Sequence, residues 1–240
     1  MKTLNELTAH IKKHNDAVII IGPGINPNKP KYDTDEFNAK YNRKNLKRNY
    51  DELIKFYIDN IHSEINTSKS YDLIKAINHS LLLDQNVNGS ITASYLHGHV
   101  NIFKCQKCNN IYPLEGIELN TEEYTVSDCE CCGSKLRPSV LLSAERYNQE
   151  IFDEFKEKLL DTHTLILIGM DYSEAPLLNL IADYGDMRSQ LNAEGNEDNE
   201  RCIVVIQSKE EEFNPNEITF CEFLVKDDIE NALTRLVGAL

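Results

Sequence analysis

The chain has 240 residues, of which 41% are hydrophobic and 27% are charged, an ordinary composition for a globular protein. Its net charge of −14 argues against a general nucleic-acid binder, because phosphate contacts need a basic surface. No apolar run is long enough to span a membrane, and the first residues contain no apolar signal core. We therefore expect a cytoplasmic protein without nucleic-acid or membrane partners.

Hydrophobic periodicity predicts a helix and a strand at the start of the chain. Residues 3–14 have the spacing of a short amphipathic helix, and AVIIIGPG (17–24) is typical of a buried parallel strand that ends in a glycine turn. The polar residues 27–50 then carry a group of cations without an intervening acid: Lys40, Arg43, Lys44, Lys47 and Arg48. We interpret this group as a solvated helix face, with a loop that covers a phosphate or a cofactor as the alternative.

Apolar runs and amphipathic segments alternate along the rest of the chain. We expect helices at 71–80, 146–161, 174–185 and 227–240, strands at 80–86, 162–170, 201–207 and 217–225, and an acidic surface loop at 191–200. Buried strands that alternate with helices predict an α/β fold with a Rossmann-like, doubly wound parallel sheet. Ligands of such sheets bind at the carboxyl ends of the strands, here GPG (22–24), DQN (84–86), GMD (169–171) and IQS (206–208).

Four of the seven cysteines form two Cys-x-x-Cys pairs with twenty residues between them: Cys105, Cys108, Cys129 and Cys132. Four thiolates in two short turns can fill every position of a tetrahedral Zn²⁺, which predicts a structural site and a reducing compartment. Cys131 could replace a neighbouring ligand, and a mixed site that uses His99 is the other alternative. We expect Cys202 and Cys221 to pack in the core.

Two polar strand ends are weak signals by themselves. GPG lacks the third glycine of a dinucleotide fingerprint, because residue 27 is a proline, although its two glycines still permit close approach to a pyrophosphate. The amides of DQNVNG (84–89) could bind a ribose or a nicotinamide, or they could simply form a turn.

The ordered set of motifs resembles the sirtuin family of NAD-dependent protein deacylases. The resemblance runs through AVIIIGPGI, LLLDQNVNG, LHGHV, CQKC, CECCGSKLRPSVLLSAE, LILIGMDYSEAPLLNLI and VVIQ, from residue 17 to residue 207. The corresponding family patterns are GAGIS, TQNID, LHG with a catalytic histidine, four zinc cysteines, LRP-x-V-x-x-FGE and GTS.

The resemblance implies a Rossmann-like NAD-binding domain at 1–98 and 141–240 and a small zinc-binding module at 99–140, with parts of 27–70 as a helical insertion or cofactor loop. NAD and an acylated lysine would lie in the cleft between them. His97 would be the catalytic base, and Asn86 would assist it. Residues 140–145 and the segment after Gly169 would flank a substrate peptide strand. The implied NAD contacts are Gly22, Gly24, Ile25, Gln85, Asn88, Gly169, Met170, Asp171, Gln207 and Asp227, with Asp228 as the alternative to Asp227 near the adenine.

Departures from the family patterns predict a divergent member. Pro23 and Asn26 replace the alanine and serine of GAGIS, and the family's GIPDFR arginine has no counterpart before Arg43. Asn88 stands where the family has an aspartate, and Asp171 would place a negative charge near the pyrophosphate. The segment Ser143-Ala144-Glu145 replaces FGE.

The resemblance thus predicts an NAD-dependent protein-lysine deacylase, which cleaves nicotinamide from NAD and transfers the acyl group to ADP-ribose. The altered segment at 143–145, together with Glu174, keeps open an ADP-ribosyltransferase or NAD hydrolase. The missing arginine, Asn88 and Asp171 keep open a catalytically impaired homologue that binds NAD or ADP-ribose.

Overall fold

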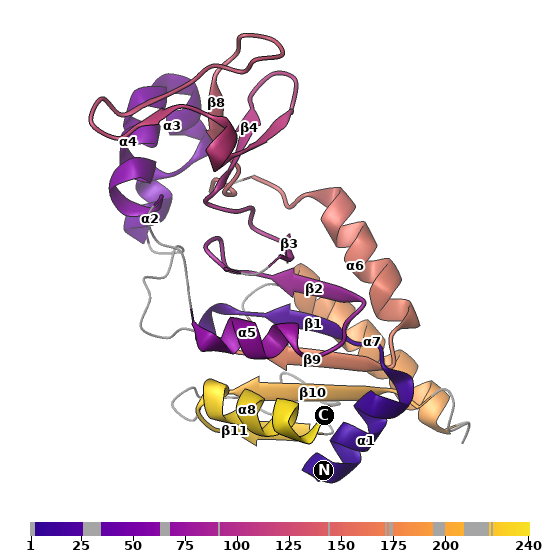
Figure 1. Cartoon of the computed structure of the whole chain (residues 1–240). Helices are drawn as coiled ribbons and strands as arrows, with labels where there is room; N and C mark the ends of the chain where they lie inside the picture. Colours follow the sequence, from indigo (N-terminus) through magenta and orange to yellow (C-terminus); the bar gives the residue numbers. More distant parts are fainter. Residues whose placement is uncertain are drawn as a thin grey trace.

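The structure is a computed structural model, and it describes residues 3–25, 35–62, 68–90, 92–143, 145–170, 172, 175–193, 200–208, 221 and 223–240. Two lobes are visible in Figure 1. The lower lobe contains the main sheet and both ends of the chain, and the upper lobe contains the cysteine-rich segment together with three helices.

The main sheet is parallel throughout and has the strand order of a Rossmann fold. From one edge to the other it runs through β11 (Phe223–Lys226), β10 (Cys202–Gln207), β9 (Thr164–Ile168), β1 (Val18–Ile21), β2 (Leu81–Asp84) and β3 (Ser94–Tyr95). The chain order of the strands reverses between β1 and β9, and such switch points are where doubly wound sheets bind ligands. The predicted doubly wound fold is confirmed.

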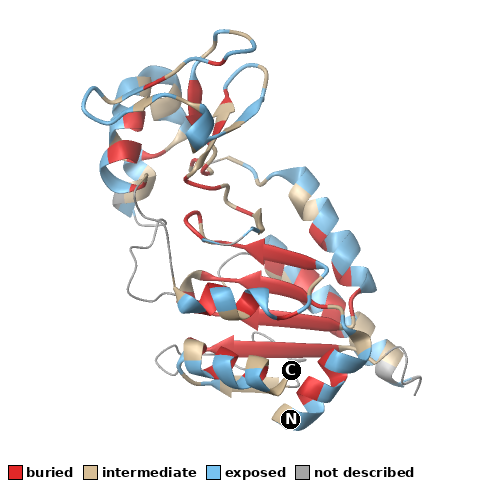
Figure 2. Cartoon of the chain, viewed as in Figure 1, coloured by how far each residue is buried: buried red, intermediate tan, exposed pale blue. Residues whose placement is uncertain are grey.

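Helices cover both faces of this sheet because its central strands are apolar on both sides. Ile19 and Ile21 face a cluster with α1 (Leu4–His14), α5 (Lys69–Lys75) and α8 (Ile229–Ala239), whereas Val18 and Ile20 face α6 (Gln149–Asp161) and α7 (Ala175–Ala193). Figure 2 shows the central strands as a continuous buried layer. This arrangement leaves the strand ends as the places where polar side chains can gather.

The helix boundaries follow from side chains that cap them. Thr3 and Glu6 form a reciprocal capping box at the start of α1, Asn148 accepts from Glu150 N at the start of α6, and Asp228 accepts from Asn231 N at the start of α8. These caps explain why α6 and α8 begin two or three residues later than the apolar spacing alone predicts.

The upper lobe has its own hydrophobic core. The helices α2 (Asp35–Lys40), α3 (Arg43–Arg48) and α4 (Tyr50–Asn60) pack against a sheet of β5 (Ile111–Pro113), β4 (Ile102–Cys105) and β8 (Leu136–Pro138). A short hairpin of β6 (Leu119–Asn120) and β7 (Thr125–Val126) and the turns η1 (Pro23–Ile25) and η2 (Leu114–Gly116) complete the elements. Tyr57 donates to Val100 O at 2.6 Å and thereby joins α4 to the chain that leads into β4.

Three boundary predictions need correction. The helix expected at 71–80 is observed at Lys69–Lys75. The helix expected at 174–185 continues to Ala193, so residues 191–193 are helical and not part of a loop. The predicted helix ends at Gly185 because glycine is unfavourable inside a helix. The observed helix continues through this residue, and Ser189 Oγ donates to Gly185 O at 2.9 Å. The strand expected at 217–225 is observed at Phe223–Lys226, and residues 209–220 lie outside the described residues.

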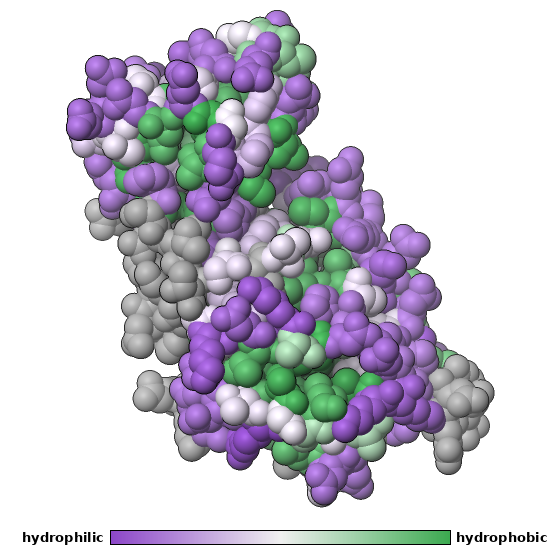
Figure 3. Space-filling model, in the orientation of Figure 1, coloured by the Kyte–Doolittle hydropathy of each residue, from purple (hydrophilic) through white to green (hydrophobic). Residues whose placement is uncertain are grey.

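The cationic group on α2 and α3 is helical and exposed, which confirms the interpretation as a solvated helix face. The space-filling view shows a mainly hydrophilic surface, with hydrophobic side chains appearing on both lobes (Figure 3). Among the described residues, no helix combines the length and the hydropathy that crossing a bilayer requires.

Candidate functional site

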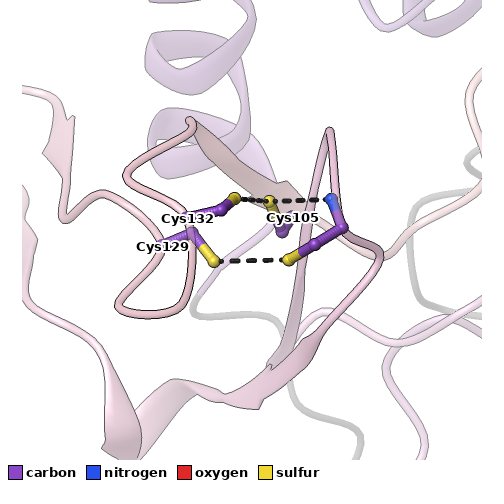
Figure 4. Close-up of side chains that lie close together, drawn as sticks. Cys105, Cys129 and Cys132 are labelled. Carbon is purple, nitrogen blue, oxygen red and sulfur yellow. Dashed lines mark hydrogen bonds between the residues drawn. The ribbon is translucent and has the colours of Figure 1, made fainter.

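The four paired cysteines come together in the upper lobe. Their sulfur atoms all lie within 4.8 Å of one another, with Cys105 Sγ 3.5 Å from Cys132 Sγ and Cys108 Sγ 3.6 Å from Cys129 Sγ. Figure 4 shows three of these side chains with their sulfur atoms turned toward one another. Four thiolates at zinc–sulfur distances of about 2.3 Å would sit roughly 3.8 Å apart, so the cluster fits a structural zinc site.

Hydrogen bonds from nearby residues hold the sulfur atoms of this cluster in place. Lys107 N and Cys108 N lie 3.4 and 3.5 Å from Cys105 Sγ, and Tyr112 Oη lies 3.0 Å from Cys129 Sγ. Cys131 is exposed and is not a member of the cluster. The predicted set of four cysteines therefore needs neither Cys131 nor a histidine.

His99, the alternative metal ligand, is engaged elsewhere. Its Nδ1 accepts from Asn101 N at 3.1 Å, so its Nε2 carries the hydrogen and donates to Gly89 O at 2.9 Å. Burial lowers the pKa of His99, which favours this neutral form. His99 therefore fixes the chain between β2 and β4, and the mixed cysteine–histidine alternative is wrong for this structure.

The glycine turns after β1 and β9 pack directly against each other at the switch point. A Cβ on Gly22 would lie 2.3 Å from Gly169 O, and a Cβ on Gly169 would lie 2.7 Å from Gly24 C. Gly169 also has a φ of 54°, which favours glycine. Both glycines are therefore required by the fold itself, whatever ligand the turns contact.

The amides of the first turn already have acceptors within the chain. Gly22 N donates to Ile168 O at 2.8 Å, Gly24 N to Gly169 O at 2.8 Å and Ile25 N to Gly22 O at 3.3 Å. A pyrophosphate beside this turn would therefore have to meet donors other than these three N–H groups.

Several of the expected NAD contacts meet at the same edge of the sheet. Gln85 is only 6% exposed, and neither its Oε1 nor its Nε2 has a hydrogen-bond partner within the part of the chain that the structure describes. Its Oε1 points toward Gly22, 2.9 Å from the position of a Cβ there. Gln207 Nε2 lies 3.4 Å from Met170 O at the ends of β10 and β9, and Asn88 is buried.

Asp227 also lies near the end of β10, because its N donates to Gln207 O at 3.2 Å. Its carboxylate forms an ion pair with Arg235 of α8 and accepts from Asp228 N. Asp171 lies outside the described residues, as do Asn26, Ala144 and Glu174.

His97 sits where the sheet meets the upper lobe. Its Nδ1 is 2.7 Å from Gln85 O, and because a carbonyl can only accept, Nδ1 carries the hydrogen. In the neutral ring the basic lone pair is then on Nε2. Leu141 N donates to His97 O at 2.7 Å, and a Cβ on Gly98, whose φ is 76°, would lie 2.2 Å from Ser139 O. The imidazole of His97 is thus held from the end of β2, and the backbone at 97–98 is held by the segment that follows β8.

A buried carboxylate that the sequence reading did not single out lies behind this site. Asp84 is fully buried at the end of β2 and accepts hydrogen bonds from Tyr71 of α5 and from Asn86. Burial raises its pKa to about 7, while the hydrogen bonds and the charge of His97 act in the opposite direction. An acid directly after the apolar run LLL (81–83) was the available signal in the sequence.

The segment after β8 is held by a second pair that sequence reading missed. Arg137, which is 4% exposed, donates to Glu145 Oε1 at 2.6 Å and to the carbonyls of Pro138 and Val140 at 3.2 Å. Leu142 N donates to Glu145 Oε2 at 2.9 Å. This ion pair closes residues 137–145 into a compact turn beside His97.

Comparisons with known proteins agree with one another. A model described as the Sir2 family matches residues 28–176. An NAD-dependent protein deacetylase of Staphylococcus aureus (strain MRSA252) is 28% identical over 119 residues, which are 49% of this chain and 47% of that protein. A protein of the same name from Staphylococcus epidermidis is 28% identical over 96 residues, 40% of this chain and 37% of that protein. The chain thus matches less than half the length of these curated relatives.

Solved structures extend the likeness to the whole fold. A crystal structure of a Sir2 homologue–NAD complex has a TM-score of 0.73 at 18% identity and covers 97% of this chain and 92% of its own. A structure of Sir2 bound to an acetylated peptide has a TM-score of 0.72 at 16% identity and covers 99% of this chain and 98% of its own. At these identities the likeness shows a shared fold.

Proposed function

We propose, from the premise that this chain belongs to the Sir2 family, that it is an NAD-dependent protein-lysine deacylase. The observation that carries the proposal is the strand-end site: His97, whose Nδ1 is held by Gln85 O, lies beside polar side chains at the carboxyl edge of a Rossmann-like sheet. The partner would be an acylated-lysine protein or peptide. The thiols of the cysteine cluster are not in disulfides, which fits a reducing compartment, and we place the protein in the cytoplasm.

The residues at this edge fit a dinucleotide. Burial of a carboxamide is costly when neither polar atom has a partner. Among the described residues this holds for Gln85, which is best explained by a ligand that both donates and accepts, as ribose hydroxyls do. Met170 and Gln207 border the neighbouring strand ends, where the second nucleotide would lie. Gly22, Gly24, Ile25 and Gly169 would shape the floor through their lack of side chains, because the first turn's amides donate within the chain.

His97 would act as the general base. NAD, when bound, supplies the ribosyl carbon that loses nicotinamide and accepts the acyl group. Because Nδ1–H of His97 donates to Gln85 O, the neutral ring can take a proton from a ribose hydroxyl at Nε2. The same carbonyl would then stabilise the imidazolium that forms, and the contacts at Gly98 and Leu141 would keep the ring in place.

The cysteine cluster would serve this site indirectly. Zinc held by Cys105, Cys108, Cys129 and Cys132 would cross-link the two turns that carry these cysteines. From that lobe β8 leads into the segment at 139–141 that contacts His97. Zinc would thus fix the position of the catalytic histidine without touching the substrate.

One observation favours a second candidate, transfer of ADP-ribose to another acceptor or to water. Addition of a peptide strand needs unused backbone donors on residues 140–145. Four of these amides already donate within the chain: Leu141 N to His97 O, Leu142 N to Glu145 Oε2, Ser143 N to Tyr41 O and Glu145 N to Leu142 O. A peptide strand would have to displace some of these bonds or bind along another edge.

Product analysis separates the candidates. The protein would be incubated with NAD, with and without an acetyl-lysine peptide, and the nicotinamide, ADP-ribose species and peptide mass would be measured. A deacylase releases nicotinamide in step with deacetylated peptide. Nicotinamide release that does not need the peptide would indicate the second candidate, and NAD binding without any release would indicate an impaired homologue.

A further inference from the structure

Asp84 is the single buried carboxylate among the described residues, and it has a complete set of donors. Tyr71 Oη donates to its Oδ2 at 2.9 Å, and Asn86 N donates to its Oδ1 at 2.8 Å. The family pattern TQNID has a threonine at this position, so the carboxylate is a feature of this chain. It lies four residues before Asn88, where the pattern's own aspartate is absent.

The carboxylate also binds the side chain of Asn86. Asn86 Nδ2 donates to Asp84 Oδ1 at 2.7 Å and to Gly22 O at 3.0 Å. A carboxamide nitrogen has two hydrogens, and these two nearer acceptors define its orientation, while Tyr71 Oη lies 3.4 Å from the same nitrogen. Oδ1 must then point away from Asp84 and Gly22, and it is the polar atom that Asn86 can offer to a ligand.

The surroundings of Asp84 keep water away from this arrangement. A Cβ on Gly89 would lie 2.3 Å from Asp84 Oδ2 and 3.1 Å from Tyr71 Oη, so the chain after β2 closes directly over the carboxylate. Tyr71 is itself buried in the core between α5 and the sheet. Hydrogen bonds to a charged group in such a dry site are stronger than on a surface.

We propose that Asp84, supported by Tyr71, is a positioning residue that locks the Asn86 carboxamide so that Oδ1 faces a hydroxyl of the bound ribose. The part that concerns ribose rests on the proposed function. The locking of Asn86 does not, because it follows from hydrogen bonds within the chain.

The strength of the lock depends on the charge of Asp84. The ionised carboxylate accepts from all three donors, whereas an acid protonated on Oδ2 would donate to Tyr71 Oη and its neutral Oδ1 would accept more weakly from Asn86. Burial raises the pKa of Asp84 to about 7, so its charge changes near neutrality. The titratable groups around it are Tyr71 from α5, Tyr95 from β3 and His97, and burial also raises the pKa of Tyr71. Among these neighbours, only the histidine is a residue type that ordinarily titrates near neutrality.

The first experiment measures the hydrogen bonding of the Asn86 carboxamide directly. The side-chain amide signals of Asn86 would be identified in nitrogen–proton NMR spectra by their absence from Asn86→Ala, and followed with pH. We expect them to titrate in the wild type and in the exposed control Asp72→Asn, and to lose this titration in Asp84→Asn. A titration that persists in Asp84→Asn would assign the effect to His97 and overturn the proposal, as would Asn86 signals that never change.

The second experiment measures the effect of Asp84→Asn on the turnover of NAD. We expect Asp84→Asn to lower kcat/KM for NAD about tenfold to a hundredfold, and to have little further effect in an Asn86→Ala background. Equal effects in both backgrounds would overturn the proposal. If the wild type cleaves no NAD, the proposed function fails, whereas the NMR titration still decides whether Asp84 locks Asn86.

Discussion

The cysteine cluster and the strand-end site hold their side chains in different ways. In the cysteine cluster, each pair spans one short turn, and the N–H groups beside Cys105 come from the next two or three residues. In the strand-end site, Asn86 contacts Gly22 and Tyr71 as well as the nearby Asp84, and Gly98 contacts Ser139, so several contacts join distant parts of the chain. The cluster therefore depends on a metal and on local spacing, while the strand-end site depends on the packing of both lobes.

The largest effect is expected from removing a zinc ligand. Structural zinc contributes about 10–16 kcal/mol of apparent binding free energy, so Cys105→Ser should lose the metal and unfold the upper lobe. Elemental analysis and limited proteolysis would measure both. Cys131→Ser, which changes an exposed cysteine outside the cluster, is the matched control and should keep the metal. Equal zinc content in both variants would show that the cluster is not the metal site.

His97→Ala should leave the fold intact and remove the general base. We expect turnover of NAD to fall by about 10²–10⁴, with NAD affinity nearly unchanged. His79→Ala is a suitable control, because His79 is also half-buried but precedes the amino end of β2. Undiminished turnover in His97→Ala, measured as nicotinamide release, would place the chemistry elsewhere.

The buried Asp84 should make stability depend on pH. Its folded pKa of about 7 lies above the ordinary value of 3.8, so the native state holds the proton more tightly than the unfolded chain. Stability relative to Asp84→Asn should therefore fall as pH rises above the unfolded pKa, by about 3 kcal/mol from pH 5 to pH 8. Urea denaturation at both pH values measures this difference. A constant or rising difference would mean that Asp84 stays ionised throughout.

Alanine substitution of one glycine in each region should have a smaller effect, and the loss of stability should differ between the two variants. Gly89→Ala places a Cβ 2.3 Å from Asp84 Oδ2 and should destabilise the protein by about 1–3 kcal/mol. Gly116→Ala in the upper lobe meets only Pro113 side-chain atoms at 3.6 Å and should be nearly neutral. Thermal unfolding of the two variants would test this contrast, which fails if both lose the same stability.

The same contrast explains what the sequence could predict. The zinc ligands and the alternating strands follow from local spacing and apolar runs, so they were predictable from residues 105–132 and 17–24. Gly22 and Gly24 were expected to permit close approach of a pyrophosphate, but the sequence does not indicate that their amides donate to Ile168 O and Gly169 O. The Arg137–Glu145 ion pair and the Tyr71–Asp84 contact likewise depend on packing that local patterns do not encode.

Calorimetric titration with NAD would show whether the carboxyl edge of the sheet is a dinucleotide site. Gln85 is the residue to substitute because neither polar atom of its buried carboxamide has a hydrogen-bond partner among the described residues. We predict saturable binding to the wild type and to the exposed-glutamine control Gln106→Ala, and affinity weakened about tenfold or more in Gln85→Ala. If the wild type showed no saturable binding, or if all three proteins bound NAD with equal affinity, the carboxyl edge of the sheet at Gln85 would not be the dinucleotide site.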